Sequence, residues 1–340
     1  MPKKNYRIIT DAQAIDHAQW EQFVFDHPQG NVFQTPQMYA AYAAAKNYQP
    51  IVVACYEADS LAGVLLAVIQ KEYKGVLGKL SARSVIWGGP LVRNHDCQLL
   101  EAILQEYDRV SKGKAIFSQV RNIFNMDWSK NALTKHGYIY EDHLNILIDL
   151  EESEEQLWKN IHSKRKNEIR RAEKDGTSFE VLNDADSLEA CWPILENVYQ
   201  RARLPLPDFS LFKELLNGKN GKSPLKVFAA MHNGKIIGAL LALCWRERVL
   251  DWYAGAYQDC LAKYPNDLLP WGAMLWGKKN GYKTFDFGGA GKPGVPYGVR
   301  DFKLKFGGEL VNLGRFNKTY KPLTMKIAKI GFRFWQIMIK

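Results

Sequence analysis

The chain has 340 residues, of which 46% are hydrophobic and 24% are charged. This length and composition predict a soluble globular protein of about two domains, and they exclude a small disulfide-stapled scaffold, a disordered chain and a coiled-coil fibre. The 46 Lys and Arg residues against 36 Asp and Glu residues give a net charge of +10, which favours anionic partners such as nucleic acid, phosphorylated ligands or an acidic membrane surface.

Membrane spans, metal ligands and disulfides are not expected. No stretch reaches the roughly 18 consecutive apolar residues that cross a bilayer, and no apolar region follows the lysines near the N-terminus, so we expect a cytoplasmic protein. The five cysteines are widely spaced, and the seven histidines form neither an HExxH nor an HxH motif. We therefore expect reduced cysteines and no bound metal.

One hairpin pattern occurs twice along the chain. Residues 52–69 (VVACYEADSLAGVLLAVI) align without a gap to residues 227–244 (VFAAMHNGKIIGALLALC). Each segment has an apolar run, a short polar turn and a second apolar run, which predicts a β-hairpin. After each hairpin, residues 99–120 and 268–289 share the pattern of a helix closed by glycine and followed by a strand. The repeated order predicts a duplicated α/β (α+β) unit, although chance agreement between apolar positions is the alternative.

The predicted domains are residues 1–150 and 151–325, with a basic tail at 326–340. A charged helix is expected to open the second domain over residues 151–176, with Ser153 as its N-cap. Its apolar residues fall near one face. Its other face carries basic side chains that could hold phosphates, unless this is simply a solvated helix face: Lys164, Arg165, Lys166, Arg170, Arg171 and Lys174.

Three motifs follow one another in the second half of the chain. They are SKRKNEIRRAEKDG from residue 163, GYKTFDFGG at 281–289 and DFKLKFGG at 301–308. In order and spacing these motifs resemble the FemABX family of peptidoglycan bridge-forming peptidyltransferases, in its FemX-type form without a coiled-coil arm. The resemblance covers nearly the whole chain. It implies two tandem GNAT-like acyltransferase domains with mixed sheets, plus a C-terminal helix.

The same resemblance implies an activity. An amino acid would pass from aminoacyl-tRNA to an amine of a peptidoglycan precursor or another cell-envelope acceptor, forming an amide without a tightly bound cofactor. The alternative is an acyl-CoA-dependent GNAT-type N-acyltransferase acting on another amine. The Q/RxxGxG/A loop that cradles pyrophosphate in acyl-CoA enzymes is missing between Trp252 and Leu269, which weakens that alternative. A non-catalytic module that binds tRNA or membranes is a third reading.

The resemblance places candidate catalytic residues near the end of the second domain. Lys303 follows Phe302 as in the family's PheLys pair, where the lysine stabilises the reacting carbonyl or holds substrate. Lys305 is its backup, on the same face of an expected strand; a plain strand-end lysine is the alternative. Asp286 and Asp251 are candidate general bases, although Asp286 is also suited to cap the next turn. No Cys/His pair or GxSxG motif is present, which favours direct attack by the amine.

Substrate-binding candidates lie earlier in the same domain. Arg201 and Arg203 resemble the family's arginine that grips precursor phosphate, because a guanidinium is bidentate and always charged; a surface salt bridge is the alternative. Tyr253 and Tyr257 are expected to line a cleft, unless they pack in the core. The donor's phosphates would contact four residues of the basic helix: Lys164, Arg165, Arg170 and Arg171.

The tail at residues 326–340 has basic side chains on one helical face and apolar ones elsewhere. Such a segment can lie on an anionic leaflet, so we expect peripheral contact with the inner membrane face. A helix packed on the core is the alternative.

Overall fold

The computed structural model describes residues 5–71, 81–182, 184–218 and 223–325. Its contacts divide the chain into two compact units, Met1–Asp142 with Leu313–Lys340, and His143–Asn312. The predicted boundaries at 150 and 325 differ from this division. The tail prediction for residues 326–340 lies outside the described residues.

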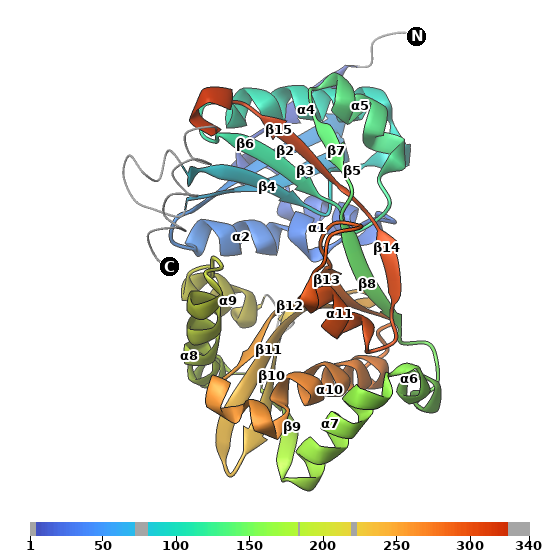
Figure 1. The fold of residues 1–340 in the computed structure, drawn as a ribbon. Helices are drawn as coiled ribbons and strands as arrows, with labels where there is room; N and C mark the ends of the chain where they lie inside the picture. Colours follow the sequence, from blue (N-terminus) through green and yellow to red (C-terminus); the bar gives the residue numbers. More distant parts are fainter. Residues whose placement is uncertain (1–4, 72–80, 183, 219–222, 326–340) are drawn as a thin grey trace. The chain divides into compact units, whose positions relative to one another are not determined.

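The first unit is built on a mixed sheet of order β1-β2-β3-β4-β6-β15-β7, with β5 beside β3 (Figure 1). Only β4 and β6 run parallel among its described pairs. Its strands are β1 (Tyr6–Ile9), β2 (Tyr48–Glu57), β3 (Ser60–Gln70), β4 (Arg83–Trp87), β5 (Leu91–Val92), β6 (Phe117–Arg121), β7 (Ile139–Glu141) and β15 (Arg315–Thr319).

Helices cover the first sheet. They are α1 (His17–Asp26), α2 (Pro36–Ala44), α4 (Cys97–Ser111) and α5 (Lys130–Lys135), with 3-10 turns η1 (Ala12–Ala14), η2 (Val32–Gln34), η3 (Arg93–His95) and η4 (Asp127–Ser129). The apolar stripe of α4, which includes Leu100, Ile103 and Leu104, is buried in the core against β2 and β3. Because β15 pairs with β6 and β7 and buries Phe316, the end of the described chain belongs to this unit.

The second unit has a mixed sheet of order β14-β8-β13-β12-β11-β10-β9. Among its described pairs only β12 and β13 run parallel. Its strands are β8 (Leu144–Asp149), β9 (Thr177–Leu182), β10 (Leu225–His232), β11 (Lys235–Trp245), β12 (Arg248–Ala256), β13 (Thr284–Gly289) and β14 (Glu309–Asn312).

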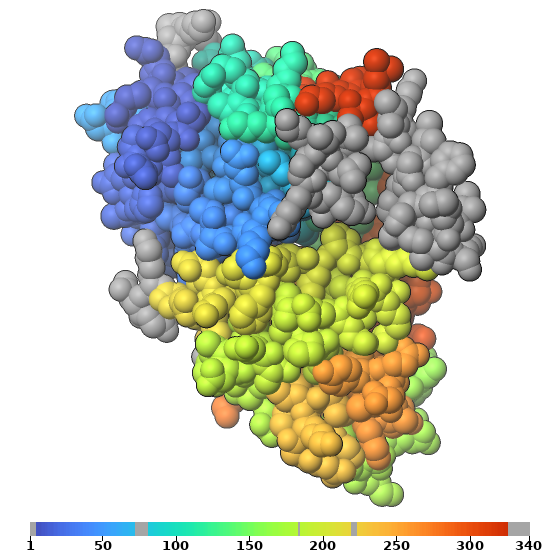
Figure 2. Space-filling view, turned by 90° about the vertical axis from the view of Figure 1, so that its left-hand side faces the viewer, coloured from blue at the N-terminus to red at the C-terminus, as the bar shows by residue number. Residues whose placement is uncertain are grey.

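Helices α7 and α10 pack on one side of this sheet and α8 and α9 on the other (Figure 1). The elements are α6 (Glu154–Asn160), α7 (Ser163–Lys174), α8 (Ala185–Ala202), α9 (Phe209–Asn217), η6 (Gln258–Lys263), α10 (Pro265–Lys279) and α11 (Gly298–Leu304). In the space-filling view the yellow-green atoms of α8 and α9 form much of the second unit's surface (Figure 2).

The two predicted hairpins are present and share a detail of register. β2 pairs with β3 and β10 with β11, and each ladder shifts at the residue just before a glycine, Gly63 or Gly238. A methyl group on Gly63 would meet Ile103 of α4, and one on Gly238 would meet Pro265 of α10. The same glycine therefore lets the following helix cross the hairpin closely in both units.

The single helix predicted over residues 151–176 is wrong. Ser153 does cap a helix, accepting from the backbone N–H of Gln156, but α6 ends at Asn160. Ile161 is extended and buried, and the imidazole of His162 caps α7 by accepting from the N–H of Lys164. Burying Ile161 and capping a second helix start explain the break, which a helical periodicity alone does not reveal.

Candidate active site

The parallel strands β12 and β13 are paired over only three residues and then diverge. Leu250 pairs with Asp286 in the last of them, and from there β12 continues along β11 alone while β13 follows β8. A β-bulge at Trp252 interrupts the β11–β12 ladder at the same level. A bulge bends its strand and redirects the neighbouring side chains, so the divergence is built into the backbone of β12.

Asp286 lies at this divergence and is fully buried. Its carboxylate accepts from Arg248 Nη1 at 3.1 Å, from the backbone N–H of Gly288 at 2.7 Å and from Asn145 Nδ2 at 3.5 Å. The bond to Gly288 is the turn-capping contact that was its alternative role. With three donors on its oxygens, Asp286 is placed to hold the end of β13.

Asp251, the next residue after the last paired position of β12, has the environment of a base. Burial raises the pKa of its carboxyl to about 6, the charge of Lys303 opposes this rise, and the charge of Asp286 adds to it. The backbone oxygen of Asp251 also lies 3.7 Å from where a side chain on Gly288 would begin. The geometry thus favours Asp251 over Asp286 as the group that exchanges a proton near neutral pH.

Lys303 lies on α11 and its ammonium group donates to the backbone oxygen of Phe287. The predicted strand at this point is wrong, since Lys303 is helical and Lys305 is the C-cap of the same helix. Two residues along a helix point to different sides, so Lys305 does not share the face of Lys303. Lys303 therefore stands alone as the candidate cation beside Asp251.

Phe302 packs inward from α11. Its ring meets Phe306 edge-to-face at 5.4 Å, and the guanidinium of Arg165 lies over it at 5.1 Å. Its role in the structure is to seat α11 on the core.

Tyr199 of α8 is a site residue that the sequence did not single out. Burial, then the charge of Asp251, raises the pKa of its hydroxyl, and the backbone of Ala254 on β12 opposes this rise, so the phenol stays protonated. Tyr297, before α11, also helps to raise this pKa. Nothing in a helical pattern marks Tyr199; only the tertiary packing of α8 on β12 brings it here.

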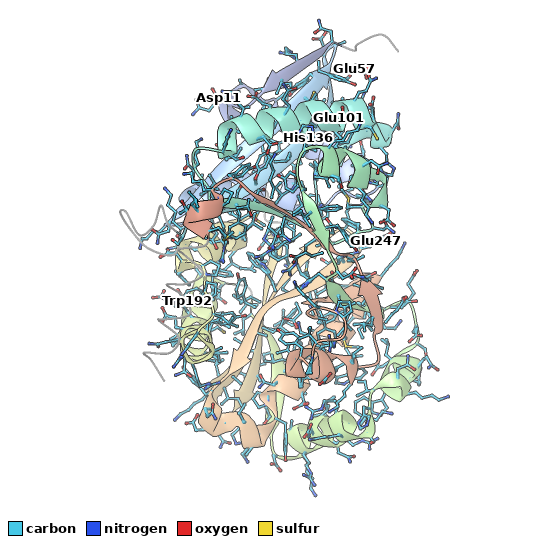
Figure 3. The ribbon with its side chains drawn as sticks, turned by 45° about the horizontal axis from the view of Figure 1, so that its top comes forward. Asp11, Glu57, Glu101, His136, Trp192 and Glu247 are labelled. Atoms are coloured by element: carbon cyan, nitrogen blue, oxygen red, sulfur yellow. The ribbon has the colours of Figure 1, made fainter. Side chains whose placement is uncertain are left out.

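An aromatic cluster stands behind Tyr199. Tyr253 packs against Tyr199 at 5.4 Å and against Phe212 at 5.2 Å, and Trp192, labelled in Figure 3, meets Phe212 at 5.3 Å. Tyr253 thus packs among rings beside the site. Tyr257 follows β12 as the N-cap of η6, with its backbone N–H bonded to Ile237.

The arginines proposed for acceptor phosphate lie at the end of α8. Arg203 is the left-handed C-cap and donates its backbone N–H to the carbonyls of Gln200 and Tyr199. Arg201 is exposed and donates to Asn197 Oδ1 at 3.4 Å. Since Arg201 is two residues from Tyr199 on the same helix, it points away from the Tyr199 side.

Contrary to the prediction from the sequence, Arg165 does not belong to the exposed basic face of α7. Arg165 is buried and makes ion pairs with Asp267 and Glu168, so its charge is neutralised inside the unit and cannot hold a donor phosphate. Lys164, Arg170 and Arg171 are exposed. Arg170 lies over the ring of Trp158 at 5.3 Å, and Arg171 donates to the Tyr264 hydroxyl at 3.4 Å.

The first unit carries no equivalent of Asp251. The repeat aligns Ala67 with Ala242; Ala242 pairs with Asp251, whereas Ala67 pairs with Ile86. An isoleucine cannot exchange a proton, so the acid–base group belongs to the second unit.

Gln34 fills the corresponding place in the first unit. It is fully buried, donates to the backbone oxygens of Leu66 at 3.1 Å and Trp87 at 2.7 Å, and accepts from the N–H of Leu66 at 2.7 Å. A side-chain amide thus satisfies the backbone groups that a separating strand leaves unpaired.

Metal-binding groups and membrane-spanning helices are both absent from the described residues. No group of three or more His, Cys, Asp or Glu side chains is placed there to hold a metal ion. Across the same residues, no helix combines the length and apolar character needed to cross a membrane.

Comparisons with known proteins bear on the fold and on the type of domain. Residues 161–303, most of the second unit, match the family model for an acetyltransferase (GNAT) domain. The structure of FemX matches with a TM-score of 0.71 at 15% identity, covering 95% of this chain and 100% of FemX. No curated protein matches the chain.

Two further structures show the same architecture. The C-terminal domain of a putative lysylphosphatidylglycerol synthetase from Agrobacterium fabrum matches with a TM-score of 0.58 at 12% identity, covering 92% of this chain and 94% of that one. A tandem GNAT protein from the clavulanic acid biosynthesis pathway matches with a TM-score of 0.59 at 9% identity, covering 94% and 99%. The predicted tandem GNAT-like α/β fold is therefore confirmed, and the chain carries an acyltransferase domain of the GNAT type.

Proposed function

We propose that this chain is an aminoacyltransferase that moves an amino acid from aminoacyl-tRNA to an amine of a cell-envelope acceptor, such as a peptidoglycan precursor, and so forms an amide. The observation that carries the proposal is found where β12 and β13 diverge: Asp251 has a pKa of about 6, and the charge of Lys303, whose ammonium group holds the end of β13, acts on that pKa. These are the two groups that ester aminolysis requires: a base for the amine and a cation for the oxyanion.

The steps follow from these two residues. The acceptor amine attacks the ester carbonyl of the donor, and Asp251 takes the proton that the nitrogen must lose. Lys303 stabilises the negative charge on the carbonyl oxygen. When the carbon–oxygen bond of the ester breaks, the carboxylic acid of Asp251 returns its proton to the leaving ribose oxygen. Since neither atom nor charge is left over, no covalent enzyme intermediate is needed.

Two features of the second unit support tRNA as the donor. At the start of α10, where a GNAT enzyme would seat the CoA pyrophosphate, Pro265 has no N–H to offer and the carboxylate of Asp267 occupies the first turn. A phosphate at that helix start would find one backbone donor fewer, and the first turn is already occupied by the ion pair between Asp267 and Arg165. The neighbouring helix α7 presents Lys164, Arg170 and Arg171 to solvent, an arrangement that suits the phosphates of a nucleic acid.

The proposal of a cell-envelope acceptor is supported by the similarity to structurally related proteins. FemX matches over the full chain, and the Agrobacterium protein is named for joining lysine to the lipid phosphatidylglycerol. Contact of the tail, residues 326–340, with an anionic membrane surface would bring a lipid-linked acceptor within reach. Arg203 and Arg201 are the proposed contacts for acceptor phosphate.

An acyl-CoA-dependent N-acyltransferase is the second candidate, favoured by the match to the acetyltransferase domain model. A donor-swap experiment separates the two. Purified protein is incubated with an amine acceptor and either radiolabelled aminoacyl-tRNA or radiolabelled acetyl-CoA, with Asp251→Asn as the inactive control. We expect amide product from charged tRNA alone. Product from acetyl-CoA alone would select the second candidate, and product from neither would leave a binding module.

A further inference from the structure

The loop between β13 and α11, residues 290–297, carries two glycines and two prolines in close succession. Gly291 and Gly294 have φ angles of +78° and +71°, a backbone that other residues adopt only with strain. Pro293 and Pro296 lack an N–H. A loop of this composition has few backbone donors of its own with which to fix its shape.

Arg300 supplies the missing donors. Its guanidinium donates from Nη1 to the carbonyl oxygens of Ala290 at 3.4 Å and Lys292 at 2.9 Å, and from Nη2 to that of Val295 at 2.6 Å. One planar fork therefore joins both ends of the turn. The start of the loop is anchored separately, because the N–H of Ala290 bonds to Leu144 of β8 at 2.7 Å.

The shape of this loop sets the position of Tyr297. The tyrosine ring packs over Gly291, where an added methyl group would come within 3.1 Å of it. Tyr297 also contributes to the raised pKa of the Tyr199 hydroxyl. The loop also presents Val295 and Tyr297 to solvent, with exposed fractions of 53% and 41%, and Val299 at the start of α11 is 45% exposed.

Arg300 and Lys303 act on the same stretch of backbone. They are three residues apart on α11 and so share a face. Lys303 holds the carbonyl of Phe287 at the end of β13, while Arg300 holds the loop that follows it. The face of α11 that offers the candidate oxyanion cation thus also fixes the loop beside it.

We infer that Arg300 is a positioning residue: it holds loop 290–297 in the conformation that seats the Tyr297 ring over Gly291, just beyond the end of β13 that Lys303 contacts, and so forms the wall against which the acceptor amine is oriented. The orientation of an acceptor amine by this wall rests on the proposed function. The loop's fixation by Arg300 rests on the hydrogen bonds alone.

The test compares Arg300→Ala and Arg300→Lys with wild type, and uses Arg109→Ala as the matched control. Arg109 is an exposed arginine of the first unit, paired only with Glu106 three residues earlier among its described contacts. Amide hydrogen exchange of the peptide that spans residues 290–299 is measured first, since it requires no substrate. We expect exchange at least about tenfold faster than wild type in both Arg300 variants and an unchanged rate in the control. Lysine should not substitute for arginine here, because an ammonium group cannot reach three carbonyls at once.

The second readout is transfer activity with and without added methylguanidinium. We expect Arg300→Ala to raise the KM for the acceptor about tenfold or more with little change in the KM for the donor, and methylguanidinium to restore it. Unchanged exchange in Arg300→Ala, or wild-type behaviour of Arg300→Lys, would overturn the inference. Faster exchange in a protein that transfers from no donor would overturn the proposed function and leave the loop's fixation standing.

Discussion

Lys303 and Lys305 have different roles because their surroundings in the fold differ. Both are lysines within the motif DFKLKFGG, but only Lys303 reaches the end of β13 and acts on Asp251. The backbone carbonyl of Lys305 instead accepts from the N–H of His162 at 2.8 Å, so this residue serves to join α11 to the start of α7.

Replacing Lys303 with Met tests its electrostatic role. Removing one oxyanion-stabilising donor typically costs about 3 kcal/mol, so turnover should fall about 100-fold. Lys305→Met is the matched comparison and should change turnover by less than about threefold. Single-turnover transfer rates measure both. Equal losses in the two variants would remove Lys303 from the site.

Asp251 makes a prediction about stability as well as chemistry. Its pKa is about 6 in the folded chain against an ordinary value of 3.8 for an aspartate, so the folded state holds the proton more tightly than the unfolded state. Stability contributed by this group is therefore full below about pH 4 and is lost as the pH rises through 6. At pH 7 the buried charge destabilises the fold by about 1–3 kcal/mol.

The variant Asp251→Asn removes that charge. Urea unfolding at about pH 7 should show a gain of about 1–3 kcal/mol, and the gain should shrink toward zero near about pH 3, where the wild-type carboxyl is mostly protonated in both states. Asp286→Asn serves as the contrast and should lose stability at pH 7, since it breaks the ion pair with Arg248. A gain for Asp251→Asn that is equal at both pH values would contradict the assigned pKa.

At the scale of elements, α7, α10 and α11 meet at one buried arginine. Arg165 of α7 pairs with Asp267 in the first turn of α10 and lies over Phe302 of α11. Burial raises the pKa of Asp267, the charge of Arg165 opposes the rise, and Glu168 adds to it. The helix that carries Lys303 is thus seated on a junction of charges inside the core.

Arg165→Met keeps the length of the side chain and leaves two buried carboxylates without a partner. Breaking a buried pair in this way costs about 3–5 kcal/mol. Arg170→Met, on the exposed side of the same helix, removes a stacking contact with Trp158 and should cost less than about 1 kcal/mol. Urea unfolding at neutral pH compares the two variants. A loss below 1 kcal/mol in Arg165→Met would show that the junction does not hold the helices together.

The elements also mark what the sequence could and could not predict. The two hairpins were predictable, because alternating apolar runs around a polar turn are local signals. The break at Ile161 and the helix at Lys303 were not, since each depends on which side chains the tertiary fold buries. For the same reason Arg165 read as one cation among six, and its carboxylate partner Asp267 lies 102 residues further along the chain.

At the scale of the whole molecule, the two units share an architecture but differ at the position of the candidate base. Asp251 in the second unit corresponds to Ile86 in the first, and the buried Gln34 satisfies the backbone there. Asp251 was predictable as a candidate only through the family resemblance. The two charged groups that act on its pKa are Lys303 of α11 and Asp286 of β13, and Asp251 in turn acts on the pKa of Tyr199 of α8. These residues come from three other elements, and no spacing in the sequence joins them.

The pH dependence of single-turnover transfer tests the role of Asp251 most directly. The rate of amide formation from charged tRNA is measured between about pH 5 and pH 8, in wild type and in Asp251→Asn. In wild type the rate should rise with pH through an apparent pKa near 6 and then level off, because the base acts only when ionised. In Asp251→Asn the rate should be at least about 100-fold lower at pH 7, with that rise absent. A variant that transfers at the wild-type rate with the same rise near pH 6 would contradict the central claim that Asp251 is the base of an amide-forming transferase.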